Sequence, residues 1–159
     1  MRTYVTYDGK PGVYFFSLDA SNLSAVWGAR VFYRLPYWQA SMKVKGRGGP
    51  KLEYVSQRQH GPKPAELRCS YGPASDRFHA RLGSIEHFLT ERYCLYAFSR
   101  KRFYRGDIHH LPWDLQQATF EVEQNTMAQP AGIQLPPQPE LVYFARELKV
   151  LFWAPERLR

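Results

Sequence analysis

Cysteine is scarce in this sequence, whose 159 residues include only Cys69 and Cys94. Neither lies near a second cysteine or a histidine at the spacing of a zinc site, so we expect two buried free thiols. Long apolar runs are also lacking, because no segment reaches the ~18 residues that a membrane-spanning helix requires. The opening segment MRTYVTYDGK lacks the apolar centre of a secretion signal. These absences predict a cytoplasmic protein.

The common catalytic sequence motifs are missing as well. The sequence contains no Gly-rich phosphate loop, no HExxH zinc motif and no GxSxG nucleophile elbow. We therefore expect neither a metal nor a cofactor, and no motif of this kind specifies a reaction.

Aromatic residues, in contrast, are abundant. Eleven Tyr, ten Phe and four Trp, within a chain that is 44% apolar, favour strands and allow one sizeable core. Strands are predicted at residues 3–7, 13–18, 38–45, 52–58, 66–71, 93–98, 103–108, 115–123 and 141–153. Asp8-Gly9 is a strong hairpin signal between the first two strands. We expect a single domain over residues 1–159.

Two segments have the pattern of helices. A main helix is predicted over about residues 22–32, with Ser21 or Asn22 as its N-cap and Pro36 beyond its end. A short helix is predicted over about residues 84–90, with Ser84 as its N-cap. The fold class is therefore β-rich α+β, and the succession of antiparallel strands favours a barrel or a strongly bent sheet.

Two arginines are candidates for charges that point inward. Arg30 follows Val26 and Trp27 at helical spacing, so a core-facing helix would carry Arg30 into the interior. Such a buried charge needs either a structural carboxylate, with Glu91 as the candidate, or an anionic ligand. Arg58 shares the face of its strand with Leu52 and other buried positions, so it is a second candidate.

Further candidate residues surround the predicted pocket. Tyr37 and Trp38 follow Pro36 and resemble an aromatic wall, for which core packing is the alternative. Glu91 stands beside Arg92, and an ion pair between them is the simplest expectation. His109 and His110 point to opposite faces if the chain is extended, so one of them can line a cavity. Structural hydrogen bonding is the favoured role for that histidine.

The net charge of +8 raises nucleic acid as an alternative partner. The basic residues gather at two expected turns: Lys43, Lys45, Arg47 and Lys51 at one, and Arg100, Lys101, Arg102 and Arg105 at the other. Charged hairpin tips also keep β proteins soluble. Nucleic-acid binding is therefore expected to be weak and indifferent to sequence.

Several segments together resemble the YqjF-like family of uncharacterised bacterial proteins. They are RTYV at residues 2–5, GVYFFSLDA at 12–20, LPYWQASM at 35–42, FLTERYCLYA at 88–97 and IHHLPWDLQ at 108–116. The resemblance covers the chain from end to end. It implies membership of the acetoacetate decarboxylase-like superfamily, and hence an antiparallel β barrel or cone that encloses a small-molecule pocket.

The resemblance does not carry over the decarboxylase reaction. That enzyme forms a Schiff base on one of two adjacent lysines, and Tyr37 and Trp38 stand at the corresponding positions here. The family also carries a substantial N-terminal region before the RTYV segment, and because Met1 stands directly before that segment here, we expect this region to be missing. We expect an unpaired sheet edge there, which favours self-association into a homo-oligomer.

The sequence therefore predicts a barrel that binds an unknown small molecule, with a carboxylate as the candidate class, and an enzymatic role is left open. The candidate ligand-binding residues are Arg30, Tyr37, Trp38, Arg58, Glu91 and His110. Two alternatives remain: a polyanion or nucleic-acid binder, and a non-catalytic interaction protein.

Overall fold

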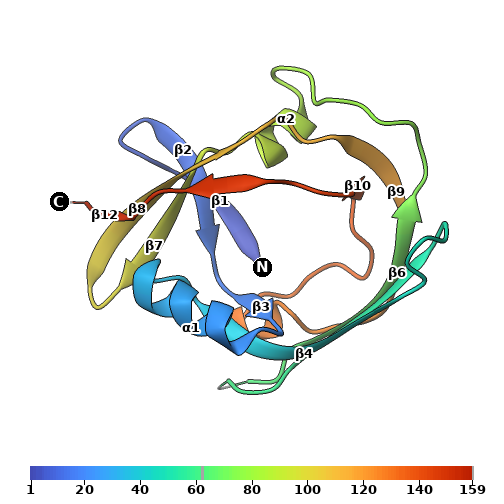
Figure 1. Cartoon of the computed structure of the whole chain (residues 1–159), viewed down its shortest axis with the longest axis horizontal. Coiled ribbons are helices and arrows are strands. Elements are labelled where there is room, and N and C mark those ends of the chain that lie inside the picture. The colour runs from blue at the N-terminus through green and yellow to red at the C-terminus, as the bar shows by residue number, and fades with distance from the viewer. Residues whose placement is uncertain (62, 159) are drawn as a thin grey trace.

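The computed structural model describes residues 1–61 and 63–158, whose strands form two curled sheets that face each other (Figure 1). A mostly β fold with two α-helices confirms the predicted class. The expectation of antiparallel strands throughout is wrong at two pairings. β2 (Lys10–Phe15) runs parallel to β7 (Cys94–Ser99), and β3 (Leu18–Ala20) runs parallel to β4 (Tyr37–Lys45).

The first sheet has the strand order β1-β2-β7-β8-β11, and β12 also pairs with β8. β1 (Arg2–Tyr7) turns into β2 through Asp8 and Gly9, whose positive φ angles of 48° and 70° confirm the predicted hairpin. β8 (Arg102–His110) follows β7 through a second tight turn at Arg100 and Lys101. β11 (Val150–Phe152) and β12 (Glu156–Arg157) come from the C-terminal part of the chain.

The second sheet has the order β10-β9-β6-β5-β4-β3. Its long strands are β4, β5 (Leu52–Arg58), β6 (Glu66–Pro73) and β9 (Leu115–Asn125), with the short β10 (Tyr143–Ala145) at one edge. The predicted basic hairpin is the β4–β5 pair, in which Ala40 lies opposite Arg58. A single 3-10 turn, η1 (Gln129–Ala131), interrupts the loop before β10.

The prediction of one continuous strand over residues 141–153 is wrong. β10 pairs with β9 of the second sheet, whereas β11 pairs with β8 of the first. The red segment in Figure 1 therefore crosses from one sheet to the other. One uninterrupted ladder could not serve two separate sheets, so the strand breaks at residues 146–149.

Both helices lie where the capping residues place them. α1 (Leu23–Phe32) begins after Asn22, whose side-chain oxygen accepts a hydrogen bond from the Ala25 N–H at 3.0 Å. α2 (Ile85–Thr90) begins after Ser84, whose hydroxyl oxygen accepts from the His87 N–H at 3.2 Å. These contacts satisfy backbone donors that the first helical turn leaves unpaired.

The core-facing stripe predicted for α1 is wrong. Val26 is buried, but Leu23 and Trp27 are 60% and 65% exposed. The helix packs against β3 and β4 at the edge of the second sheet, so it contacts the protein along a narrow line. Arg30 is exposed as a result, and its guanidinium carbon lies 5.1 Å from the centroid of the Trp38 ring. Arg30 is therefore not a buried charge, and it needs neither the structural carboxylate nor the anionic ligand that burial would require.

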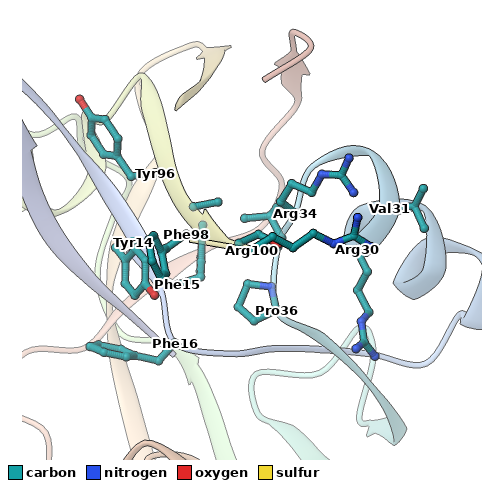
Figure 2. Close-up of a pocket in the computed structure, with 13 residues that line it drawn as sticks. Tyr14, Phe15, Phe16, Arg30, Val31, Arg34, Pro36, Tyr96, Phe98 and Arg100 are labelled. Atoms are coloured by element: carbon teal, nitrogen blue, oxygen red, sulfur yellow. The ribbon is translucent and has the colours of Figure 1, made fainter. Parts of the chain in front are cut away.

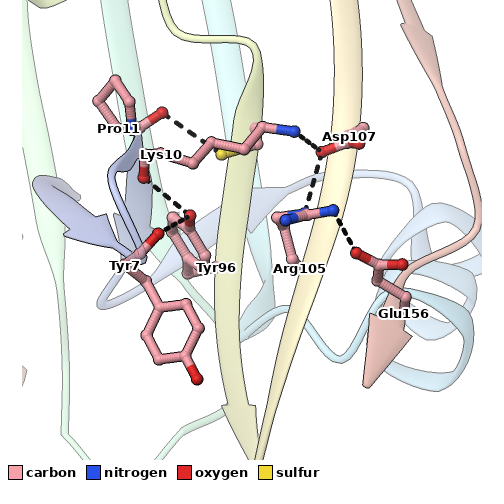
Figure 3. A network of polar contacts seen from close by, with 8 residues as sticks. Tyr7, Lys10, Pro11, Tyr96, Arg105, Asp107 and Glu156 are labelled. Carbon is pink, nitrogen blue, oxygen red and sulfur yellow. Dashed lines mark hydrogen bonds and ion pairs between the residues drawn. The ribbon is translucent and has the colours of Figure 1, made fainter. Parts of the chain in front are cut away.

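The core between the sheets is centred on Val13, Leu35, Leu95 and Ala97. A polar network on the other side of β2 and β7 ties the first sheet together (Figure 3). The Tyr96 hydroxyl donates to the Lys10 carbonyl at 2.8 Å, and Lys10 pairs with Asp107 at 2.9 Å. Burial raises the pKa of Tyr96 to about 12, so this hydroxyl keeps its proton.

Gly12 allows β2 to lie close to β7. A Cβ atom at this position would stand 2.6 Å from Cys94 Sγ, and a backbone oxygen lies nearly as close. No side chain larger than hydrogen fits there without displacing β7.

Among the described residues, neither helix has the length and apolar character needed to cross a bilayer.

Candidate functional site

A cavity of about 170 Å³ lies between the first sheet, β4 and the C-terminal crossing segment. Most of its wall is apolar, formed by Val13, Leu18, Leu35, Leu95, Ile108 and Val150. Arg92, His110 and Trp113 contribute polar atoms to the same wall, together with Tyr37. An apolar cavity with a few convergent polar groups is the usual form of a small-molecule site.

Arg92 is the buried charged group of this cavity, and it lacks a counter-ion; Arg2 also lines the cavity but is exposed and donates to the Tyr4 hydroxyl and the Leu89 carbonyl. The residue is 9% exposed, and no carboxylate among the described residues forms an ion pair with it. Its Nη1 donates to the Glu91 carbonyl at 3.0 Å, while its Nε makes no hydrogen bond. The guanidinium lies over the rings of Phe88 at 4.3 Å and Tyr4 at 5.7 Å. These rings offset part of the cost of removing the guanidinium from water, but they do not supply the oxygen or nitrogen acceptor that Nε lacks.

Trp113 presents a second unsatisfied donor. Its indole Nε1 is buried without a hydrogen-bond partner among the described residues, and the side chain lines the same cavity. An indole N–H and a guanidinium N–H can only donate. Buried donors without acceptors are rare in folded proteins, because each loses its hydrogen bonds to water. The wall of the cavity therefore contains two residues whose buried donors need the same kind of partner.

The local fold explains how Arg92 comes to lie there. α2 ends at Thr90, and the Arg92 N–H donates to the Thr90 carbonyl at 2.9 Å in a tight connection. β7 starts at Cys94, which is completely buried. The backbone of Arg92 is thus fixed between the end of a helix and the start of a central strand.

His110 is the histidine of the pair that faces inward, as the alternation predicts. It is 4% exposed, whereas His109 is exposed. Its ring nitrogens face two backbone carbonyl oxygens, Leu111 at 2.8 Å and Arg92 at 3.3 Å. Carbonyl oxygens only accept, so His110 spends its donor capacity on the backbone. His110 thus contacts the backbone of Arg92, and these backbone contacts agree with the structural role favoured from the sequence.

Tyr37 also lines the cavity. Burial raises the pKa of the Tyr37 hydroxyl. The group therefore stays a neutral phenol and can donate or accept a hydrogen bond. It cannot form an imine, in keeping with the expectation from the sequence.

Glu91 does not line the cavity, and the expected ion pair with Arg92 is wrong. The Glu91 carboxylate instead accepts a short hydrogen bond from the Tyr93 hydroxyl. This bond raises the pKa of Tyr93 to about 12. Neighbouring side chains in an extended segment point to opposite sides, so Glu91 reaches residue 93 rather than residue 92.

Arg58 is buried as expected but belongs to a different region. Its guanidinium forms two hydrogen bonds with the Asp19 carboxylate, at 2.7 and 3.0 Å, and both side chains are almost fully buried. The pair reaches across β4 over the small side chain of Ala40, beside Trp38. Arg58 and Trp38 thus form a structural cluster away from the cavity.

The two cysteines match the sequence prediction. Cys69 and Cys94 are buried free thiols. Burial raises the pKa of both thiols, so neither is an activated nucleophile.

Of the six candidate residues, the structure brings Tyr37 and His110 together in the cavity, and it places Arg30, Trp38, Arg58 and Glu91 elsewhere. Arg92 and Trp113 were missed as site residues. The available signal for Arg92 was an arginine directly before the apolar run of residues 93–98. Nothing in the sequence indicates that Trp113 Nε1 lacks an acceptor, because this depends on distant parts of the chain.

Comparison with known proteins gives two matches. The DUF2071 family model, described as an uncharacterized conserved protein, matches residues 1–149. The uncharacterized protein YqjF of Bacillus subtilis strain 168 is 48% identical over 153 residues. The match covers 96% of this chain but 62% of that relative, so the chain spans less than two thirds of its length.

Proposed function

We propose that this chain, which belongs to the DUF2071 family of uncharacterised conserved proteins, binds a small organic carboxylate in its interior cavity. The observation that carries the proposal is that Arg92 and Trp113 line one cavity and that each has a buried donor, Arg92 Nε and Trp113 Nε1, without an acceptor. A carboxylate supplies both the missing negative charge and several acceptor lone pairs.

Charge favours an anion over a neutral ligand. Removing a guanidinium from water costs several kcal/mol, and an opposite charge nearby offsets much of this cost. The described residues give Arg92 two aromatic faces and one carbonyl oxygen but no carboxylate. A bound carboxylate would complete this environment, in the way that Asp19 does for Arg58.

The size of the cavity limits the rest of the ligand. About 170 Å³ is less than the roughly 300–1,000 Å³ of sites for drug-sized molecules. The apolar wall formed by Val13, Leu95 and Ile108 suits a short hydrocarbon chain. The proposed ligand is therefore a carboxylate with a small aliphatic body.

We also propose that the fold is that of the acetoacetate decarboxylase-like superfamily, without its reaction. Two curled sheets around a cavity support this relationship. Tyr37, which the resemblance aligns with one of the enzyme's lysines, lines the cavity, and no lysine lines this cavity among the described residues. We therefore expect no decarboxylation of acetoacetate and no borohydride-trapped adduct.

The first test compares two ligands of the same shape. Isobutyrate and its neutral amide, isobutyramide, are titrated into the protein, and binding is followed by ligand-observed NMR. We expect isobutyrate to bind at least about tenfold more tightly, because only the carboxylate neutralises Arg92. Arg92→Met should remove this preference, and Trp113→Phe should weaken isobutyrate binding by about tenfold.

Arg81→Met is the matched control, since Arg81 is exposed and makes no ion pair with the described residues. This variant should bind isobutyrate as the unchanged protein does. Equal binding of the acid and the amide, or equal weakening by Arg81→Met and Arg92→Met, would show that the cavity does not recognise a carboxylate through Arg92.

A further inference from the structure

A second pocket, of about 350 Å³, lies where β2 and β7 end, between the end of α1 and the β7–β8 turn (Figure 2). It shares Phe15 and Leu35 with the interior cavity, but Val13 and Leu95 line only the cavity, and Tyr14 and Tyr96 line only this pocket. Figure 2 shows Arg30, Arg34 and Arg100 along one side and Tyr14, Phe16 and Phe98 on the other. We propose that this pocket binds a nucleoside phosphate.

The three arginines present a positive charge that the described residues do not neutralise. No aspartate or glutamate lines the pocket. The side chains of Arg34 and Arg100 make no hydrogen bond or ion pair within residues 1–61 and 63–158, and the Arg30 guanidinium lies over the Trp38 ring without an ion pair in the same residues. By contrast, Arg58, Arg68, Arg77 and Arg105 all pair with carboxylates. Guanidinium groups bind phosphate oxygens through paired hydrogen bonds, so a phosphate suits this side of the pocket.

The backbone at two of these arginines is unusual. Arg34 and Arg100 have φ angles of 58° and 51°, and Lys101 next to Arg100 has 61°. These values fall in the left-handed region, where glycine or asparagine is favoured and a long side chain is costly. Arg34 follows the end of α1, where helices commonly close with a left-handed residue, and Arg100 with Lys101 forms the two-residue β7–β8 hairpin turn, which needs two positive φ angles. Two loops far apart in the sequence thus carry an arginine to the same pocket.

The opposite side of the pocket suits a planar base. Phe16 and Phe98 are 37% and 51% exposed, and Tyr14 lies edge-on to Phe16 with ring centroids 5.6 Å apart. Exposed aromatic rings beside a basic surface are a common platform for stacking nucleobases. A volume of about 350 Å³ is within the range of sites for small ligands. The pocket therefore offers one side for a phosphate and another for a base.

A mononucleotide fits better than a polynucleotide. The other basic tip, at Lys43, Lys45, Arg47 and Lys51, belongs to the β4–β5 hairpin of the second sheet. Figure 1 shows this hairpin on the side of the molecule away from the β7–β8 turn that carries Arg100. The two basic regions do not form one continuous groove along which a nucleic-acid backbone could lie.

The test measures AMP binding by isothermal titration calorimetry, with adenosine, inorganic phosphate and a short single-stranded DNA as comparison ligands. We expect AMP to bind at least about tenfold more tightly than adenosine or phosphate alone, because only AMP engages both sides. Arg34→Asn and Arg100→Asn should each weaken AMP binding by about tenfold or more. Asparagine tolerates the left-handed conformation, so thermal melting should show both variants to be at least as stable as the unchanged protein.

Arg102→Gln is the matched control, since Arg102 is an exposed arginine of the same turn that does not line the pocket. It should leave AMP binding unchanged. Absence of AMP binding, or equal weakening by Arg102→Gln and Arg100→Asn, would overturn the proposal. Phosphate binding as tight as AMP would contradict the base site, and much tighter DNA binding would replace the mononucleotide with a polynucleotide.

Discussion

Two buried arginines of this protein have opposite surroundings. Arg58, in the second sheet, has the Asp19 carboxylate within hydrogen-bonding distance through two nitrogens, and both side chains are 2–3% exposed. Arg92, at the start of β7, is 9% exposed and has only aromatic faces and a backbone carbonyl beside it. Within the described residues, Arg58 has a carboxylate partner and Arg92 does not.

The contrast separates a structural group from a binding group. A buried charge that has its partner contributes to the fold, and its chemistry is already satisfied. A buried charge without a partner is costly in the free protein and gains most from a ligand of opposite charge. Arg92 also shares its cavity with an unsatisfied indole donor, whereas Arg58 shares its surroundings with packed Trp38 and Ala40.

The largest expected effect comes from breaking the complete pair. Asp19→Ala leaves the Arg58 charge buried without a partner and should destabilise the protein by roughly 3–5 kcal/mol. Urea denaturation measures the free energy of unfolding. Glu121→Ala is the control, because Glu121 forms an exposed pair with Lys51 at 2.7 Å, and its loss should cost at most about 1 kcal/mol. Equal losses in the two variants would show that burial does not distinguish the pairs.

A smaller effect is expected when the same substitution is made at each arginine. Arg58→Met strands Asp19 and should again cost several kcal/mol, whereas Arg92→Met removes a charge that has no partner. The ligand-free Arg92→Met protein should be as stable as the unchanged protein, or more stable by about 1 kcal/mol. The substitution removes the cost of burying a charge, and this gain outweighs the loss of the contacts between the guanidinium and the rings. Thermal and urea unfolding of both variants provide the measurement. A large loss of stability in Arg92→Met would show that Arg92 has a structural role.

The smallest effect concerns Glu91, whose carboxylate would have to leave Tyr93 to form an ion pair with Arg92. Its hydrogen bond raises the pKa of Tyr93 to about 12, above the ordinary value of about 10. The raised pKa means that this bond stabilises the folded state below about pH 10 and ceases to do so as the pH rises to about 12. Absorbance titration of tyrosinate, with Tyr93→Phe for assignment, follows the ionisation.

Glu91→Gln removes the negative charge and should return the pKa of Tyr93 toward about 10. A Tyr93 that already titrates there in the unchanged protein would mean that Glu91 is free to pair with Arg92. The distinction between the two arginines would then fail.

Local sequence signals predicted much of the fold. The Asp8-Gly9 turn, the Asn22 and Ser84 caps and the alternation of the long strands all correspond to elements of the structure. The failures share one cause, since each depends on contacts between distant segments. The periodicity of α1 correctly gave a helix but not the side that packs, because only the position of β3 and β4 decides how far Arg30 is covered.

The candidate site shows the same division more sharply. Alternation correctly put His109 and His110 on opposite faces, and burial of Arg58 followed from its strand. The sequence did not show that Asp19 completes Arg58, because the two are 39 residues apart and meet across β4. Nor did it show that Glu91 turns to Tyr93 and leaves Arg92 without a carboxylate.

The amino-acid sequence by itself thus determined the turns, the helix caps and the inward or outward direction of strand residues, since these depend on neighbours a few positions away. The tertiary structure alone decided the parallel pairings, the crossing of residues 143–152 between the sheets, and which buried donors lack an acceptor. Whether a charge is satisfied depends on every segment packed around it. For Arg92 those segments are β1, α2, β8 and the chain at Trp113, which only the folded protein brings together.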